Sequence, residues 1–110
     1  MKRKLFIKMP YLKMIKNGSK PLEARANYPN LRRINKNDQI TFMSGNLNVS
    51  TLVKRVTVYK TVNEMLKSEN VEDLIPGMSL DEAKEAYNAI YPPEKVQKNG
   101  GMRVFELKLL

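Results

Sequence analysis

The stretch of residues 47–58 constrains the fold more than any other part of the chain. Its apolar residues alternate with polar ones, which predicts a strand with one buried face, but the alternation changes phase. Leu47 and Val49 occupy one parity. Val56 and Val58 occupy the other, so the phase switches near residues 51–53. A switch within a long strand indicates a β-bulge or a sharp bend, and either lets a small sheet curl towards closure. The sequence therefore predicts a curled sheet that approaches a barrel.

The remaining elements follow from periodicity, capping and turn residues. Thr61 and Ser79 each stand three residues before a glutamate, and this capping-box spacing predicts a helix start at each position. Residues 95–101 have the polar composition of a mobile loop. The expected order is β-α-β-β-β-α-α-β, an α+β fold with a small curled mixed β-barrel flanked by three short helices. The expected strands cover residues 5–9, 21–26, 38–43, 47–58 and 105–109, and the expected helices begin near residues 10, 61 and 79.

Composition limits the chemistry and the compartment. A length of 110 residues suits one domain, residues 1–110, with one modest core. The chain has no cysteine and no histidine, so disulfides, thiolate sites and the commonest general base are excluded, and we expect no metal centre and no cofactor. No apolar run approaches the roughly 20 residues of a membrane span, and no apolar signal segment follows the basic start. We therefore expect a cytoplasmic protein that does not associate with membranes.

The charge is distributed unevenly along the chain. The net charge is +9, and residues 1–60 hold fourteen lysines and arginines against two acids, whereas residues 61–110 hold six against nine. A strongly basic half favours a polyanionic partner, because neutralising phosphates supplies most non-specific nucleic-acid affinity. RNA or a nucleotide-like ligand is the expected partner. A basic surface that only keeps the protein soluble is the alternative.

One short segment gathers three charges directly after a glycine that can end a helix. Residues 18–25 read G-x-K-x-x-E-x-R, with Lys20, Glu23 and Arg25 at the charged positions. If this segment is a strand, Glu23 and Arg25 share one face, and Lys20 leans over that face from the strand entrance. Such a cluster binds an anion, orients a carbonyl, or forms an ion pair on a solvated edge.

The same residues, in their wider setting, carry a family resemblance. Met9-Pro10-Tyr11, Ile15 and the G-x-K-x-x-E-x-R motif resemble the opening of the ASCH (activating signal cointegrator homology) family. Residues 32–42, 59–66, 74–77 and 86–91 resemble later parts of the small single-domain ASCH proteins of prokaryotes. The resemblance implies a β-barrel of the PUA-like type whose relatives bind RNA in a surface cleft. Lys20, Glu23 and Arg25 would lie in that cleft.

The resemblance also implies alternatives to simple binding. Some small ASCH proteins are similar to metal-independent amidohydrolases that remove an acetyl group from modified cytidine, with a lysine at the position of Lys20, a threonine at that of Glu23 and a glutamate near Pro76. Here Glu23 replaces the threonine, so the candidate catalytic residues are Lys20 and Glu23, with Glu72 or Asp73 as a displaced acid. A ribonuclease and a protein-interaction module, with a protein partner, are further alternatives.

Further residues are candidates for the binding cleft because of their charge or aromatic ring. Cations of the basic half steer a phosphate backbone, and tyrosines stack on bases. The alternative for each is an ordinary surface cation or a packing residue with a wet hydroxyl. These additional cleft candidates are Tyr28, Arg32, Arg33, Lys54, Arg55 and Tyr59.

Overall fold

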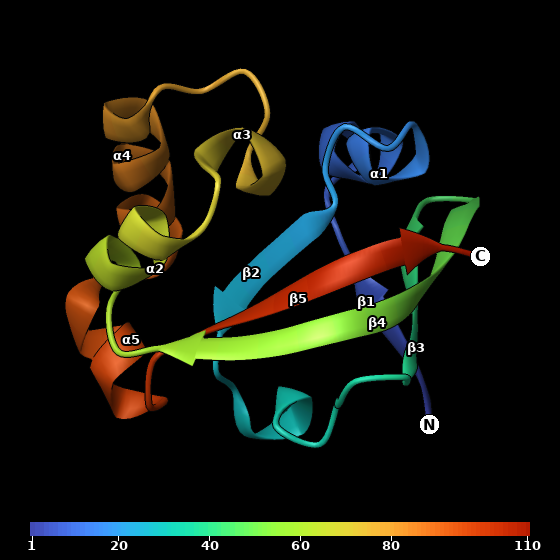
Figure 1. Ribbon diagram of the computed structural model, residues 1–110, viewed down its shortest axis with the longest axis horizontal. Coiled ribbons are helices and arrows are strands. Elements are labelled where there is room, and N and C mark those ends of the chain that lie inside the picture. The colour runs from blue at the N-terminus through green and yellow to red at the C-terminus, as the bar shows by residue number, and fades with distance from the viewer.

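The computed structural model describes all residues from Met1 to Leu110 and is an α+β fold built on one five-stranded sheet (Figure 1). The strands lie in the order β1-β3-β4-β5-β2. β1 and β3 are parallel, and every other neighbouring pair is antiparallel. The strand bounds are β1 Lys2–Phe6, β2 Leu22–Ala26, β3 Gln39–Ser44, β4 Leu47–Tyr59 and β5 Met102–Leu109.

The three expected helices are present, and two more accompany them. The helices are α1 Met9–Lys16, α2 Val62–Ser68, α3 Val71–Leu74, α4 Leu80–Ile90 and α5 Pro93–Lys98, with a 3-10 turn η1 at Pro29–Leu31. The expectation of a mobile loop at residues 95–101 is wrong, because α5 occupies most of it and buries Val96. Pro93 ends the preceding helix pattern, but proline also fits the first turn of a helix and here begins α5.

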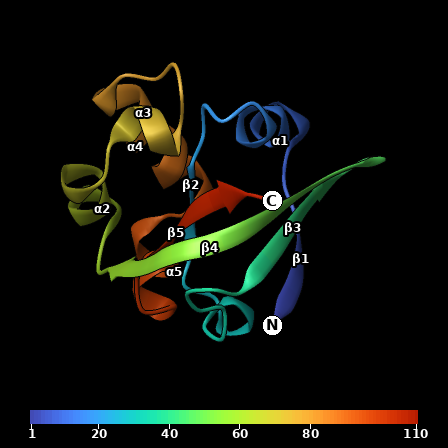
Figure 2. The same cartoon turned by 45° about the vertical axis from the view of Figure 1, so that its right-hand side comes forward.

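The predicted phase switch in β4 is confirmed as a register shift between Val53 and Arg55. Before it, Val49 and Val53 face the inside of the curl, and after it Val56 packs on the same inner cluster. The extra residue, Lys54, changes the inward-facing positions of the strand from odd-numbered to even-numbered residues. The apolar side chains therefore stay on the same face before and after the bulge. The sheet curls there into a half-barrel (Figures 1 and 2).

The core consists of two clusters, one on each face of the sheet. Phe105 and Leu107 belong to the inner cluster, which α1 closes with Leu12 and Ile15. Val104 belongs to the outer cluster, which is covered by α2, α3, α4 and α5. β5 contributes to both clusters because its side chains alternate between the two faces of the sheet.

The curl leaves an opening between the two edge strands, β1 and β2. No ladder joins them, but the Arg25 guanidinium on β2 donates a hydrogen bond of 2.6 Å to the carbonyl oxygen of Phe6 on β1. The candidate site residues described below collect at this opening. None of the helices combines the length and the apolar character that crossing a bilayer requires.

The position of β5 generates a stability prediction. Phe105 is 0% exposed at the centre of the inner cluster, so Phe105→Ala should lower the free energy of unfolding by about 3–5 kcal/mol. Leu109, in the same strand, is 43% exposed, so Leu109→Ala should cost less than about 1 kcal/mol. Urea denaturation of both variants checks this. Similar losses in the two variants would contradict the proposed centre of the core.

Candidate functional site

The G-x-K-x-x-E-x-R motif forms the turn from α1 into β2 and the first part of that edge strand. Gly18 has φ +86°, a left-handed conformation that glycine adopts without steric cost, and it ends the helix. The Lys20 amide then donates to the Met14 carbonyl at 3.1 Å, which fixes the chain as it enters β2. This turn holds Lys20 at the mouth of the sheet opening.

Lys20, Glu23 and Arg25 form one connected cluster, as the alternation of the strand predicted. Lys20 Nζ lies 3.2 Å from Glu23 Oε1, and Arg25 Nε donates to Glu23 Oε2 at 3.1 Å. Lys20 and Glu23 are buried, whereas Arg25 is partly exposed. A buried carboxylate between two cations is electrostatically compensated.

The Lys20 ammonium is held by three oxygen atoms. It donates to the Leu22 carbonyl at 2.7 Å and to the Leu74 carbonyl, and Glu23 is the third neighbour. These three oxygens match the three N–H donors of an ammonium group. The ring of Tyr11 covers the group, with its centroid 5.7 Å from Nζ. Lys20 therefore ties β2 to the end of α3 and fixes Glu23.

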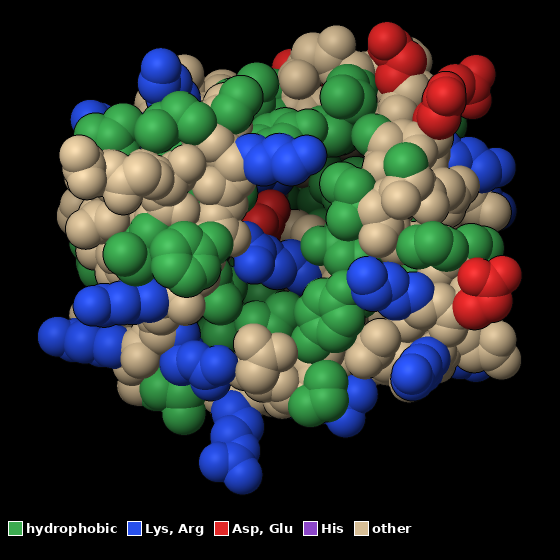
Figure 3. Space-filling view, turned by 180° about the vertical axis from the view of Figure 1, so that it is seen from behind, with side chains coloured by type: hydrophobic (Ala, Val, Ile, Leu, Met, Phe, Trp, Pro, Cys, Tyr) green, Lys and Arg blue, Asp and Glu red, His purple; other side chains and the backbone are tan.

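The cluster lies in a pocket of about 220 Å³. Tyr11, Tyr87 and Tyr91 line it, and Phe6 and Ile90 are exposed apolar residues of its lining. Figure 3 shows a hollow in which acidic side-chain atoms lie between basic ones, with hydrophobic side chains around them. An aromatic wall with a few fixed polar groups is typical of a site for a small planar ligand.

The tyrosine hydroxyls of this pocket are unused by the protein. Neither Tyr87 nor Tyr91 makes a side-chain hydrogen bond, although buried tyrosines usually do. Burial, and then the charge of Glu23, raises the pKa of Tyr87 far above its usual value. The same two causes, in the same order, raise the pKa of Tyr91 to about 12. Both hydroxyls therefore stay protonated at neutral pH and are free to bind a ligand.

The two displaced acids considered for catalysis lie elsewhere. The Glu72 carboxylate accepts the Gly77 amide at 3.1 and 3.2 Å and so fixes the turn after α3. Asp73 lines a different cavity, of about 530 Å³, beside Lys54 and Glu106. Glu23 is therefore the only carboxylate that lines the motif pocket. No group of acidic side chains is arranged to hold a metal ion.

Three of the additional cleft candidates lie outside the pocket, on the other face of the sheet. Arg55 forms a two-pronged ion pair with Glu69, at 2.8 and 2.9 Å, and bonds Glu106 at 2.9 Å. The Tyr59 hydroxyl donates to Glu69 at 2.5 Å, and Lys54 lies 3.8 Å from Glu106. The hydrogen bond from Arg55 holds the pKa of Glu69 below its usual range. This network fastens the end of α2 to β4 and β5.

None of the other three candidates lines the pocket, and only Tyr28 contacts a residue of its wall. The Tyr28 ring packs on Tyr91, with centroids 6.4 Å apart. Arg32 donates to the carbonyls of Asn27 and Asn99 at 3.0 and 3.1 Å, and Arg33 is exposed.

Sequence reasoning missed the aromatic wall. Tyr87 belonged to the predicted apolar face of α4, and Tyr91 to its terminating segment, which indicated packing and a helix end rather than a site. The signal in the sequence was the helical spacing of four apolar and aromatic residues that share one face: Ala86, Tyr87, Ile90 and Tyr91.

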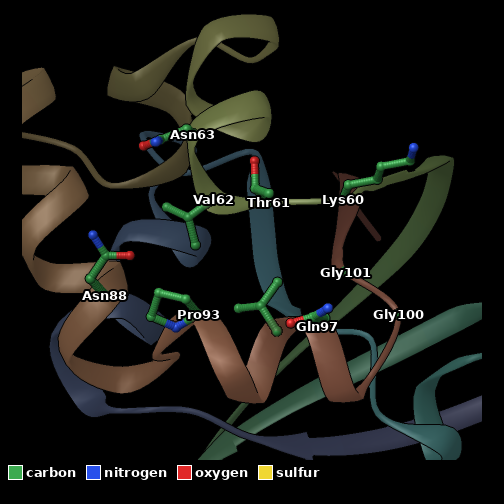
Figure 4. Close-up of a pocket in the computed structure, with 10 residues that line it drawn as sticks. Lys60, Thr61, Val62, Asn63, Asn88, Pro93, Gln97, Gly100 and Gly101 are labelled. Carbon is green, nitrogen blue, oxygen red and sulfur yellow. The ribbon is translucent and has the colours of Figure 1, made fainter.

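A larger cavity of about 570 Å³ lies apart from the motif, among α2, α4 and α5 (Figure 4). Asn63, Asn88 and Gln97 line it together with the backbone of Gly100 and Gly101. Lys60 is its only charged residue. Gly101 is required there, because a Cβ atom would lie 2.1 Å from the Tyr59 carbonyl oxygen.

Comparisons with known proteins identify the family and agree with the fold. A family model described as the ASCH domain matches residues 5–100. The crystal structure of hypothetical protein PH0355 is 31% identical, with 100% of each chain covered and a TM-score of 0.90. The solution NMR structure of protein PF0455 from Pyrococcus furiosus is also 31% identical, with 100% of this chain and 98% of that chain covered and a TM-score of 0.80. No curated protein matches the chain.

The raised pKa of Tyr91 predicts a loss of stability at high pH. Unfolded tyrosine loses its proton near pKa 10, whereas folded Tyr91 keeps it to about 12. Between these values the unfolded chain binds fewer protons, so the free energy of unfolding falls as pH rises. Tyr91→Phe removes this titration, so its stability should decline less over that interval. Urea denaturation across the interval measures the difference, and parallel curves would contradict the assignment.

Proposed function

Because the chain belongs to the ASCH domain family, a family of RNA-binding-type domains, we propose that it binds RNA and takes one base into the pocket around Lys20, Glu23 and Arg25. One observation carries the proposal. A single carboxylate, fixed between two cations, faces a pocket walled by aromatic rings whose hydroxyls have no partner in the protein. Unstacked bases are bound by aromatic stacking combined with hydrogen bonds to their edges.

The pocket offers both parts of that recognition. A planar base fits against the rings of Tyr87 and Tyr91 and buries its faces. Glu23 has further acceptor capacity, because each carboxylate oxygen has two lone pairs and contacts one cation of the protein. An exocyclic amino group of a base is the complementary donor. Each free tyrosine hydroxyl donates a hydrogen bond to an acceptor on the base edge or accepts one from a donor there.

In this proposal, Lys20 positions Glu23 and does not contact the ligand. Its three oxygen neighbours occupy the ammonium, and the Tyr11 ring covers it. The geometry favours binding over hydrolysis of an acylated nucleoside for the same reason. That alternative requires an amine free to take a proton and a second acid, and Glu23 is the only carboxylate in the pocket.

The basic half of the chain supports RNA rather than a free nucleoside as the partner. Lys8 is exposed, lines the pocket, and forms no ion pair with an acid of the protein. A phosphate attached to the bound base would meet this cation. Affinity for RNA should therefore weaken as salt rises.

Glu23→Gln separates base recognition from general attraction of phosphates. If Glu23 accepts hydrogen bonds from the base, its neutralisation should weaken binding of a short single-stranded RNA at least about tenfold. If the site only attracts phosphates, removing a negative charge should strengthen binding. Glu85→Gln is the matched control, because Glu85 is exposed on α4 and forms no ion pair. Fluorescence anisotropy with labelled RNA measures both variants.

Tyr87→Phe supplies a second variant that keeps the fold. The Tyr87 hydroxyl has no partner in the protein, so its removal should leave the unfolding free energy unchanged while it weakens RNA binding several-fold. Unchanged RNA affinity in both Glu23→Gln and Tyr87→Phe would exclude the pocket as the base site.

A further inference from the structure

One face of β1 carries exposed lysines and an exposed aromatic ring. Lys2, Lys4 and Phe6 alternate with inward residues, and all three are exposed, with Phe6 77% exposed. Lys8, directly after the strand, is exposed too and lines the motif pocket. None of these lysines forms an ion pair. A phenylalanine exposed among unpaired lysines serves neither the core nor a salt-bridge network.

The sheet surface around this row is uncovered and has no acidic residue. The residues beside Lys2, Lys4 and Phe6 on β3 are Gln39, Thr41 and Met43. Their partners on β4 are Leu52, Ser50 and Asn48. In Figures 1 and 2 the helices α2 to α5 gather on the opposite side of the molecule from β1 and β3. Asp38, directly before β3, is neutralised by the N-terminal amine at 3.0 Å.

We propose that a single strand of RNA leaves the pocket and runs along β1, with one base stacked on Phe6 and its phosphates on Lys8, Lys4 and Lys2. This inference rests on the proposed function, because the pocket supplies the anchor for the strand. It adds the class of ligand, a single-stranded oligonucleotide rather than a nucleoside. It also adds the surface that the strand follows.

The spacing and continuity of the row fit such a strand. Alternate residues of a β-strand stand about 7 Å apart, so the lysines form a regular line of charge along an extended backbone. Proteins that bind single strands combine a cationic track with aromatic stacking platforms. Phe6 and Lys8 line the pocket, and Arg25 bonds the Phe6 carbonyl, so the row and the pocket meet at these two residues.

The exposed ring favours a single strand over a duplex or an acidic protein. In a duplex the base faces are stacked on one another and are not available to Phe6. An acidic peptide would pair with the lysines and leave the ring uncovered. Only a partner with both phosphates and free base faces uses the whole row.

Binding of a labelled single-stranded RNA of about eight nucleotides and of a nucleoside monophosphate tests the proposal. The oligomer should bind the unaltered protein more tightly than the monophosphate does. Lys2→Gln/Lys4→Gln should weaken only the oligomer and reduce the slope of log affinity against log salt by about 1.4, since each single-strand phosphate contact contributes about 0.7. Phe6→Ala should weaken the oligomer at least about fivefold.

Lys67→Gln/Lys84→Gln is the control for charge, because both lysines are exposed on α2 and α4 and form no ion pair. This variant should keep most of the affinity and the full salt slope. A duplex of the same sequence and polyglutamate should both compete poorly.

Three kinds of result would overturn the proposal. If the monophosphate binds but the oligomer gains nothing, or if both double variants have the same salt slope, the track along β1 is absent and the pocket remains. Effective competition by polyglutamate together with unchanged binding by Phe6→Ala would show a merely cationic surface. If neither the monophosphate nor the oligomer binds, the proposed function itself fails.

Discussion

The buried carboxylate of Glu23 holds together the open side of this half-barrel. Through Lys20 it is connected to the end of α3, because the same ammonium also bonds the Leu74 carbonyl. Through Arg25 it is connected to β1, because that guanidinium also bonds the Phe6 carbonyl. One negative charge thus fixes three segments around an opening that no strand pairing closes. The same charge faces the pocket, so the group that stabilises the opening is also the polar centre of the proposed base site.

The curl of the sheet determines what each surface does. The bulge at Lys54 keeps the apolar face of β4 on the inner cluster, with Val53 before it and Val56 after it. Helices cover only one part of the outer face, and the part formed by β1 and β3 stays open to solvent. The pocket lies where the uncovered strands end and the helical layer begins. In our proposals, a base enters this junction and the strand that carries it continues over the uncovered part.

Features that depend on residues close together in the sequence were predicted correctly. Contacts between segments far apart in the sequence were not. The phase of Val49 and Val56 was sufficient to predict the bulge, and the alternation from Lys20 to Arg25 to predict the charge cluster. Arg55 was placed in the cleft because it is basic, but the bulge directs it to the outer face, where Glu69 binds it. Tyr87 was correctly attributed to the core, but its second place, in the wall of the pocket, was missed because nothing in the order of residues indicates that α4 packs beside β2. Counting charges in the sequence gives the number of cations, but it does not show which of them form ion pairs in the fold.

The central claim is that RNA binds at the junction of β1, β2 and α4, and mapping by NMR chemical shifts tests it most directly. Titration of the labelled protein with a short single-stranded RNA should shift the amide signals of residues 2–8, 22–26 and 86–91 first. The cavity among α2, α4 and α5 offers an internal comparison, because it is larger but lacks both the carboxylate and the aromatic wall. Shifts confined to residues 60–63 and 96–101, or spread evenly over all exposed lysines, would contradict the account.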